Sequence, residues 1–201
     1  MEKKLLITGF DPFGGGNVNP SWEAVKRLPE QVGEYKVHKL AIPTVFGEAA
    51  QLVLAEAETL LPEAIICVGL AGGRDAVTPE RIAVNIRDAR IPDNRGFQPR
   101  GERVAPEGPA AYFSTLPVER MVENIRQAGI PAAVSNTAGT FVCNDVLYTL
   151  LHRFDGTAVR VCFIHVPYLP SQGTPNMELS DTVKALTAAI LTLDEKTATM
   201  G

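Results

Sequence analysis

The alternation of apolar runs with helical patterns predicts an α/β fold, with one domain over residues 1–201 of this chain. Six short apolar segments are typical of strands, and five longer segments have the apolar spacing of helices. The apolar segments are nearly continuous rather than alternating with polar residues, as in strands that are buried on both faces. We therefore expect a mostly parallel, twisted sheet that helices cover on both sides.

The predicted strands are short runs rich in aliphatic residues. They are 4–10 (KLLITGF), 37–43 (VHKLAIP), 64–70 (AIICVGL), 81–87 (RIAVNIR), 132–136 (AAVSN) and 159–166 (VRVCFIHV). The predicted helices are 20–28, 46–61, 118–129, 144–154 and 177–193. Gly129 is a helix stop, and Ser180 or Asp181 can cap the last helix, because small polar side chains satisfy free backbone N–H groups there.

Residues 90–114 (RIPDNRGFQPRGERVAPEGPAAYFS) interrupt this alternation. The segment is dense in proline, glycine and charge, and it shows no periodicity. Loops longer than about 15 residues without regular structure are uncommon, and they are often binding loops. We expect this one to pack beside the functional site, and we expect the tail after residue 193 to be frayed.

Composition excludes several classes of protein. Apolar residues make up 45% of the chain and charged residues 21%, which does not fit a disordered or fibrous protein. The net charge is −4 with no basic stripe, so we expect no nucleic-acid partner. No apolar run has the length of a membrane span or a signal peptide, so we expect no membrane partner. Three cysteines without a disulfide spacing suit a reducing cytoplasm.

Cys143 is the best candidate nucleophile. It lies in the segment 135–144 (SNTAGTFVCN), directly before the predicted helix 144–154. The N–H groups at a helix start favour an anion, so we expect this thiol to be more acidic than a free cysteine. Cys67 and Cys162 lie within apolar strands, where buried structural cysteines are common.

His165 is the best candidate base, because it ends the predicted strand 159–166 and catalytic groups gather at the carboxyl ends of strands. Glu80 precedes the strand 81–87. It is either a solvated carboxylate or the acceptor for the histidine Nδ1–H, which would fix the tautomer. His38, in a strand near a sheet edge, and His152, at a helix end, have structural explanations.

The segment 7–20 (ITGFDPFGGGNVNP) follows the first strand and precedes a helix. It lacks the spacing of a phosphate-binding loop. Phe10 and Phe13 indicate either the wall of an apolar pocket or core residues beside a glycine-rich turn. The histidines and cysteines lack the spacing of metal ligands, so we expect no metal site.

Five motifs together resemble the pyrrolidone carboxyl peptidases, also called pyroglutamyl peptidases type I, a family of cytoplasmic cysteine peptidases. In chain order they are GFDPFGG (9–15), GLAGGRDAVTPERIAVN (69–85), DARIPDN (88–94), SNTAGTFVCN (135–144) and HVPYLPSQ (165–172). The resemblance covers nearly the whole chain. It implies a three-layer α/β/α sandwich around a mixed sheet, of the phosphorylase/hydrolase-like kind, and in many members a homotetramer.

The resemblance also implies an activity and a site. It implies hydrolysis of the bond after an N-terminal pyroglutamyl (5-oxoprolyl) residue of peptides, without a cofactor. Cys143 would attack, His165 would act as base and then acid, and Glu80 would orient it. The Cys143 N–H and Arg90 would form the oxyanion hole. The implied substrate-binding residues surround a small ring; they are Phe10, Phe13, Asn19, Thr44, Leu70, Ile91, Phe141 and Val142.

Leu70 departs from the family pattern, because many members have glutamine there, and this removes a possible polar contact with the lactam. Two other functions stay open at this point. A nucleoside phosphorylase-like enzyme would need phosphate and no nucleophilic cysteine. A non-catalytic binding protein of the same fold would lack a member of the triad, whereas Glu80, Cys143 and His165 are all present.

Overall fold

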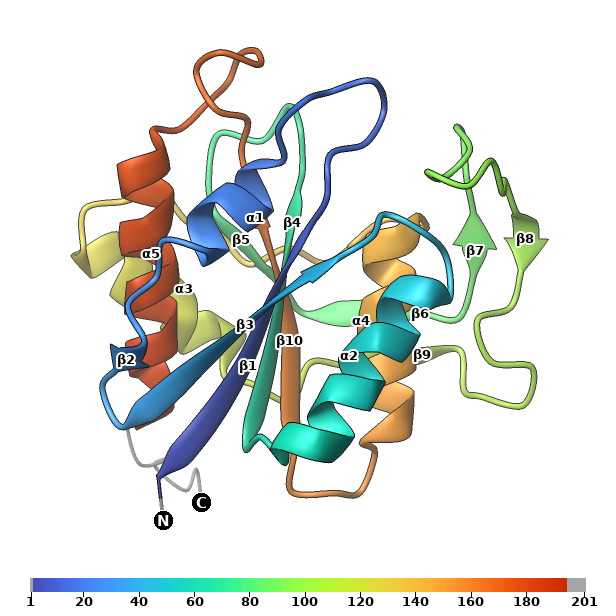
Figure 1. Ribbon diagram of the computed structural model, residues 1–201, viewed down its shortest axis with the longest axis horizontal. Helices are drawn as coiled ribbons and strands as arrows, with labels where there is room; N and C mark the ends of the chain where they lie inside the picture. The colour runs from blue at the N-terminus through green and yellow to red at the C-terminus, as the bar shows by residue number, and fades with distance from the viewer. Residues whose placement is uncertain (1, 195–201) are drawn as a thin grey trace.

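The computed structural model describes residues 2–194 and has a twisted six-stranded sheet at its centre, with strand order β2-β3-β1-β4-β10-β5 (Figure 1). Helices α1, α3 and α5 cover one face of the sheet, and α2 and α4 cover the other (Figure 1). The predicted α/β sandwich around a mixed sheet is therefore confirmed. The predicted frayed tail lies, apart from Asp194, outside the described residues.

The four central strands are parallel to one another. They are β3 (Tyr35–Ile42), β1 (Lys3–Phe10), β4 (Ala64–Leu70) and β10 (Arg160–Val166). Three of them are almost completely buried, whereas β3, the one next to β2, is only partly buried. Two short antiparallel strands form the edges, β2 (Gln31–Val32) and β5 (Thr78–Glu80). The parallel strands end at the same edge of the sheet, where ligand sites of open α/β sheets occur.

The five helices lie where the apolar spacing predicts them. They are α1 (Pro20–Val25), α2 (Glu48–Leu60), α3 (Val118–Gln127), α4 (Val142–Arg153) and α5 (Leu179–Leu191), which a short 3-10 turn, η1 (Thr192–Asp194), follows. The cap predicted at Ser180 or Asp181 is wrong, because α5 begins earlier, with Glu178 at the N-cap. Each helix buries one apolar side against the sheet, as an amphipathic helix must.

Two predicted strands are not formed as single strands. The segment 81–87 breaks into β6 (Ile82–Val84) and β7 (Arg87–Asp88), and 132–136 makes only isolated bridges. In the segment 81–87 a side chain intervenes: Asn144 on α4 accepts the Val84 N–H at 2.9 Å and donates to the carbonyls of Val84 and Ile86. These contacts occupy backbone groups of Val84 and Ile86 that a further strand would need, so the segment packs on α4 instead of joining the central sheet.

The segment 90–114 is more ordered than its sequence predicts. It contains β8 (Arg100–Glu102), which pairs with β7, and β9 (Ala111–Phe113), which pairs with β6. The carboxylate of buried Asp93 accepts N–H groups from Arg95, Phe97 and Phe46, which fixes the first turn of the segment. Among residues 2–194, no helix is both long and apolar enough to cross a bilayer.

Candidate active site

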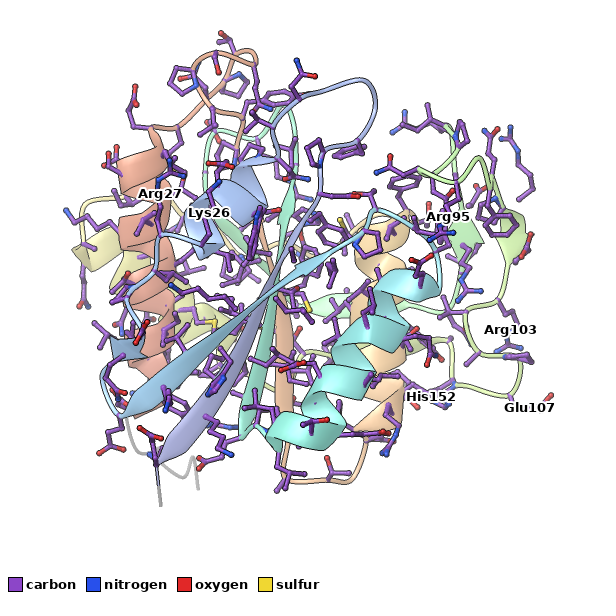
Figure 2. All side chains as sticks on the ribbon, in the orientation of Figure 1. Lys26, Arg27, Arg95, Arg103, Glu107 and His152 are labelled. Atoms are coloured by element: carbon purple, nitrogen blue, oxygen red, sulfur yellow. The ribbon has the colours of Figure 1, made fainter. Side chains whose placement is uncertain are left out.

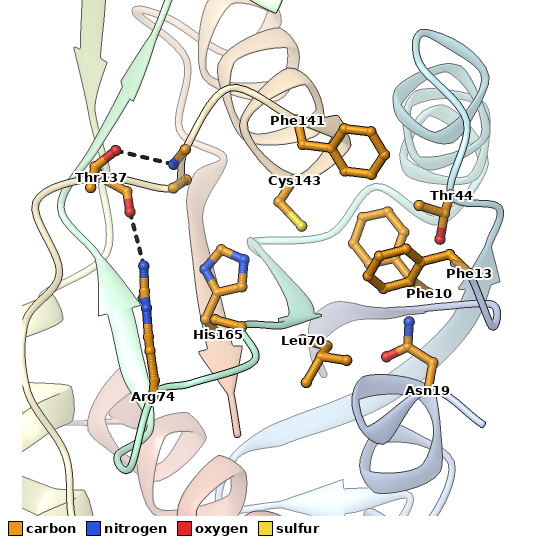
Figure 3. Close-up of a pocket in the computed structure, with 13 residues that line it drawn as sticks. Phe10, Phe13, Asn19, Thr44, Leu70, Arg74, Thr137, Phe141, Cys143 and His165 are labelled. Carbon is orange, nitrogen blue, oxygen red and sulfur yellow. Dashed lines mark hydrogen bonds between the residues drawn. The ribbon is translucent and has the colours of Figure 1, made fainter. Parts of the chain in front are cut away.

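A cavity of about 270 Å³ opens at the carboxyl edge of the sheet (Figure 3). It brings together residues from the ends of β1, β4 and β10, from the loops after β1, β3 and β4, and from the start of α4 with the loop that precedes it. The lining residues are Phe10, Phe13, Asn19, Thr44, Leu70, Ala71, Arg74, Thr137, Ala138, Gly139, Phe141, Cys143 and His165. Segments far apart in the sequence thus meet around the Cys143 thiol and the His165 imidazole.

Cys143 lies in the first turn of α4, whose N-cap is Phe141. The helix start can approach the sheet closely because position 69 on β4 is glycine. A Cβ atom built on Gly69 would lie 3.0 Å from the Cys143 sulfur and 2.7 Å from the Phe163 ring. Gly69 therefore provides the space in which the thiol sits beside the end of the sheet.

The two residues after Cys143 fix the start of α4. Asn144 hydrogen-bonds to the backbone of Val84 and Ile86, which ties the start of α4 to the segment 81–87. Asp145 is fully buried, and its carboxylate accepts a hydrogen bond from Arg87 Nε at 2.6 Å and from the Gly47 N–H at 2.8 Å. A buried carboxylate that is paired and hydrogen-bonded in this way holds its position. The first turn of α4, and with it the thiol, is consequently held in place.

His165 and Glu80 form a buried pair. The His165 Nδ1 atom lies 2.7 Å from the Glu80 Oε1 atom, and both side chains are almost fully shielded from solvent. An ionised carboxylate only accepts hydrogen bonds, so the imidazole carries its proton on Nδ1 and leaves Nε2 as an acceptor. Figure 3 shows the ring next to Cys143. The antiparallel pairing of β5 with β10 brings the two residues together.

Arg74 belongs to the same cluster, although the sequence did not identify it as a site residue. Its Nη1 atom lies 2.7 Å from Glu80 Oε1 and 2.5 Å from Thr78 Oγ1, and its Nη2 atom donates to the Thr137 carbonyl at 3.1 Å. Its only sequence signal was its place in the GLAGGRD motif. The guanidinium joins the carboxylate of the pair to the loop that precedes Cys143.

The surroundings of the pair keep the carboxylate charged and the imidazole neutral. Burial by itself would raise the pKa of Glu80, but the hydrogen bonds from His165 and Arg74 reverse this, and the pKa is lowered overall. Burial lowers the pKa of His165, and the nearby positive charge of Arg74 lowers it further, against the opposing effect of Glu80. His165 is therefore available as a base at neutral pH.

The expectation of an unusually acidic thiol is wrong. Burial raises the pKa of Cys143 to about 12, and the negative charge of Glu80 adds to this effect. The backbone N–H of Cys143 and the charge of Arg74 act in the opposite direction but do not outweigh burial. The thiol is thus protonated at neutral pH, and it needs a base to become a nucleophile.

Aromatic rings form the other end of the cavity. The centroids of Phe13 and Phe141 are 6.3 Å apart, and Phe46 meets Phe141 edge-on at 5.2 Å. Asn19 and Thr44 support the loop that carries Phe13: Asn19 donates to the Asp11 carbonyl at 2.8 Å, and Thr44 donates to the Asp11 carboxylate at 2.8 Å. This end therefore presents mainly flat apolar surfaces whose positions are fixed.

Three residues of the predicted site do not line the cavity. Arg90 and Ile91 lie on the surface, and Ile91 faces a neighbouring groove instead. The Val142 side chain is fully buried among the core residues between α4 and the sheet, because the first turn of α4 turns this side chain inward. The arginine that does line the cavity is Arg74.

The remaining cysteines and histidines lie away from the cavity lining. Cys67 and Cys162 are fully buried within β4 and β10, and burial raises the pKa of Cys67 to about 12. His152 bonds to the Tyr112 hydroxyl at 2.8 Å, and Figure 2 shows it at the periphery of the molecule. Within residues 2–194, no three His, Cys, Asp or Glu side chains are grouped as a metal site.

A thiol in the first turn of a helix, next to an imidazole whose tautomer a buried carboxylate fixes, defines a cysteine hydrolase. The sequence matches the family model for pyroglutamyl peptidase over residues 3–196. The chain belongs to the pyroglutamyl peptidase family.

Relatives agree over nearly the full length. The pyrrolidone-carboxylate peptidase of Levilactobacillus brevis is 53% identical over 194 residues, covering 93% of this chain and 95% of that protein. The pyrrolidone-carboxylate peptidase of Escherichia fergusonii is 51% identical, and the match covers 94% of this chain and 92% of that protein. The crystal structure of pyroglutamyl peptidase I from Bacillus amyloliquefaciens superposes with a TM-score of 0.91 at 49% identity, covering 95% of this chain and 96% of that one. The structure of pyrrolidone carboxyl peptidase from Thermococcus litoralis superposes with a TM-score of 0.91 at 40% sequence identity. The match covers 96% of this chain and 94% of that one.

Proposed function

We propose that this protein is a cysteine peptidase that removes an N-terminal pyroglutamyl residue from peptides. The observation that carries the proposal is the cavity itself, in which an aromatic end adjoins the Cys143 thiol and the His165 imidazole. Arg74, the charged residue in the lining, lies on the far side of His165 from Phe13 (Figure 3). The aromatic end is therefore suited to an uncharged group.

A pyroglutamyl residue meets that demand. It has no free α-amine, and its lactam is small, flat and neutral. Ligand sites commonly combine apolar walls with a few polar groups. We propose that Phe10, Phe13 and Phe141 contact the faces of the ring. Leu70 lines the same cavity and offers only an aliphatic surface, so the lactam amide is held without a side-chain hydrogen bond from this position.

The protonation states of Cys143 and His165 determine the first step of the proposed reaction. The thiol is protonated and the imidazole is neutral, so His165 Nε2 takes the Cys143 proton as the sulfur attacks the scissile carbonyl. The C–S bond forms, His165 gives the proton to the leaving nitrogen, and the C–N bond breaks to leave a thioester. Water, deprotonated by His165, then attacks the thioester carbonyl, the C–S bond breaks, and His165 returns the proton to the Cys143 sulfur as pyroglutamate leaves. Glu80 stabilises the imidazolium in both steps.

The negative oxygen that forms during attack needs donors. The Cys143 N–H, in the first turn of α4, is one such donor in this proposal, since N–H groups there lack partners within the helix. Arg90 lies on the surface outside the cavity, so a part for it in the oxyanion hole stays a prediction. A cytoplasmic location and a homotetramer also stay predictions, and light scattering after size-exclusion chromatography measures the assembly.

Release of a chromophore from anilide substrates tests the proposed function. We expect hydrolysis of the pyroglutamyl anilide to exceed that of prolyl and glutaminyl anilides by about 10²-fold or more in kcat/KM, because both controls carry an amine that the aromatic end leaves unpaired. The rate should not depend on added phosphate, which separates hydrolysis from a phosphorylase reaction. Comparable rates for the three anilides would contradict the proposal.

The acid limb of the pH profile tests the electrostatics of the pair. Because the pKa of His165 is lowered from its usual 6.5, kcat/KM should hold below pH 6.5 and fall only as the pH drops through this lowered pKa. Arg74→Gln removes a nearby positive charge, so the pKa of His165 rises and the acid limb moves to higher pH. Arg153→Gln, which removes an exposed arginine beside Glu58, should leave the limb in place. If the acid limb of kcat/KM stayed at the same pH in Arg74→Gln, the charge of Arg74 would not act on the pKa of His165.

A further inference from the structure

A second, larger depression of about 620 Å³ adjoins the cavity. We call it the outer groove. It shares Phe13 and Leu70 with the cavity, so the two depressions meet at these side chains, whereas Cys143 and His165 line the cavity alone. Leu70 pairs with Val166, the residue after His165, so this junction lies next to the imidazole. The residues that line the outer groove are Phe13, Gly14, Gly15, Gly16, Asn17, Val18, Leu70, Ile91, Tyr168, Ser171 and Gln172.

The groove has two defined walls. One is the glycine-rich loop after β1, and the other is the loop after β10, which carries the residues of the HVPYLPSQ motif. The Gln172 amide joins the walls: its Nε2 atom donates to the Val18 carbonyl at 2.9 Å, and its Oε1 atom accepts the Leu169 N–H at 3.0 Å. This side chain spans the two loops and holds the groove at a fixed width.

Tyr168 is held firmly in the second wall. A Cβ atom on Gly72 would lie 2.2 Å from its ring, and one on Gly173 would lie 3.3 Å from it. The ring thus packs directly on the backbone of the loop after β4, in space that any other residue at position 72 would occupy. The mechanism above uses neither Tyr168 nor Gln172, although both belong to the motif that supplies His165.

The groove is uncharged and partly apolar. Its lining among the described residues contains no aspartate, glutamate, lysine, arginine or histidine. Val18 and Ile91 stand on it with 41% and 48% of their surfaces exposed. On the first wall, the N–H groups of Gly14 and Gly15 make no hydrogen bond within residues 2–194. The groove thus offers apolar side chains together with free backbone donors, which suits an extended, uncharged peptide.

We propose that the outer groove binds the peptide segment that follows the scissile bond, and that it favours an uncharged, apolar first residue there. This inference rests on the proposed function. With the lactam at the aromatic end and the leaving nitrogen beside His165, the next residue lies only about 3.5 Å further along an extended chain. The surface that continues past Leu70 is the outer groove, so the enzyme selects its substrates by the leaving peptide as well as by the lactam.

A substrate series with different leaving groups tests the proposal. Pyroglutamyl amide, which releases ammonia, places nothing in the groove and serves as the internal reference. In pyroglutamyl-leucine, -lysine and -aspartate amides the first residue changes only in its side chain. Amine release followed by chromatography should give the wild type a kcat/KM for the leucine substrate about tenfold above that for the aspartate substrate, an order typical of one side chain in an apolar pocket.

Charge substitutions on the two walls should then redirect this preference. Val18→Asp and Ser171→Asp each place a carboxylate in the groove, so each should raise the lysine-to-leucine ratio of kcat/KM several-fold. Val18→Asn and Ser171→Asn are neutral controls of the same shape and should not. A lost contact or a poorly folded variant lowers all rates together and does not produce this reversal, and thermal melts of the four variants check the fold.

Three results would overturn the inference. One is a wild type that hydrolyses all four substrates equally. Another is a ratio that does not respond to either aspartate variant. The third is a ratio that responds instead to Thr137→Asp, on the opposite side of the cavity, which would place the leaving peptide beside Arg74. A wild type that does not hydrolyse even pyroglutamyl amide would instead contradict the proposed function itself.

Discussion

Replacing Cys143 with alanine is expected to lower kcat/KM for a pyroglutamyl anilide by about 10⁴-fold or more, as removal of a nucleophile does in other hydrolases. The sulfur is the atom that forms the bond to the scissile carbonyl in the proposed reaction. No other described thiol lines the cavity, because Cys67 and Cys162 are fully buried within strands. The measurement is chromophore release by wild type and variant at matched concentration.

Cys162→Ala is the matched control for this experiment. It likewise removes one thiol, in this case a fully buried one in β10 below the cavity, so it should lower the melting temperature and keep hydrolysis near the wild-type rate. An active Cys143→Ala variant would contradict the assignment of the nucleophile. Mass spectrometry after rapid acid quenching adds a direct check, since the proposed thioester adds one pyroglutamyl group to the wild type and none to the variant.

Glu80→Gln is expected to lower kcat by about 10²–10⁴-fold, by analogy with loss of the orienting carboxylate in other triads. Glutamine is nearly the same size, but it is neutral and cannot stabilise the imidazolium. The charge of Glu80 also raises the pKa of His165. Without it this pKa falls further, so the acid limb of the residual activity should move to lower pH. Arg74→Gln should move the same limb to higher pH.

These opposite shifts separate an electrostatic effect from a loss of structure. A variant that only disturbs packing changes the rate without moving the two limbs in opposite directions. Thermal melts should accompany both variants, because Glu80 and Arg74 form an ion pair whose carboxylate is fully buried, and breaking buried pairs destabilises proteins. Full activity of Glu80→Gln across neutral pH would show that the carboxylate does not act on His165.

The sequence by itself predicted the fold class and the places of its main elements. Continuous apolar runs identify the parallel strands, because strands buried on both faces have no polar side, and apolar spacing identifies the helices. The positions of Cys143 at a helix start and His165 at a strand end follow from these elements. Their possible roles could therefore be argued before any contact was known, and five motifs supplied the family.

Only the tertiary structure decided the contacts between distant segments. The segment 81–87 does not join the central sheet: its first half pairs with β9, and Asn144 on α4 bonds to the free backbone groups of Val84. Arg74 enters the site through an ion pair with Glu80 that no spacing indicates. The thiol is less acidic than its helix position predicts, because the pKa depends on how far the sulfur is buried as well as on the nearest N–H groups. Local patterns report which element forms, whereas burial and charge at a site are summed over everything that packs around it.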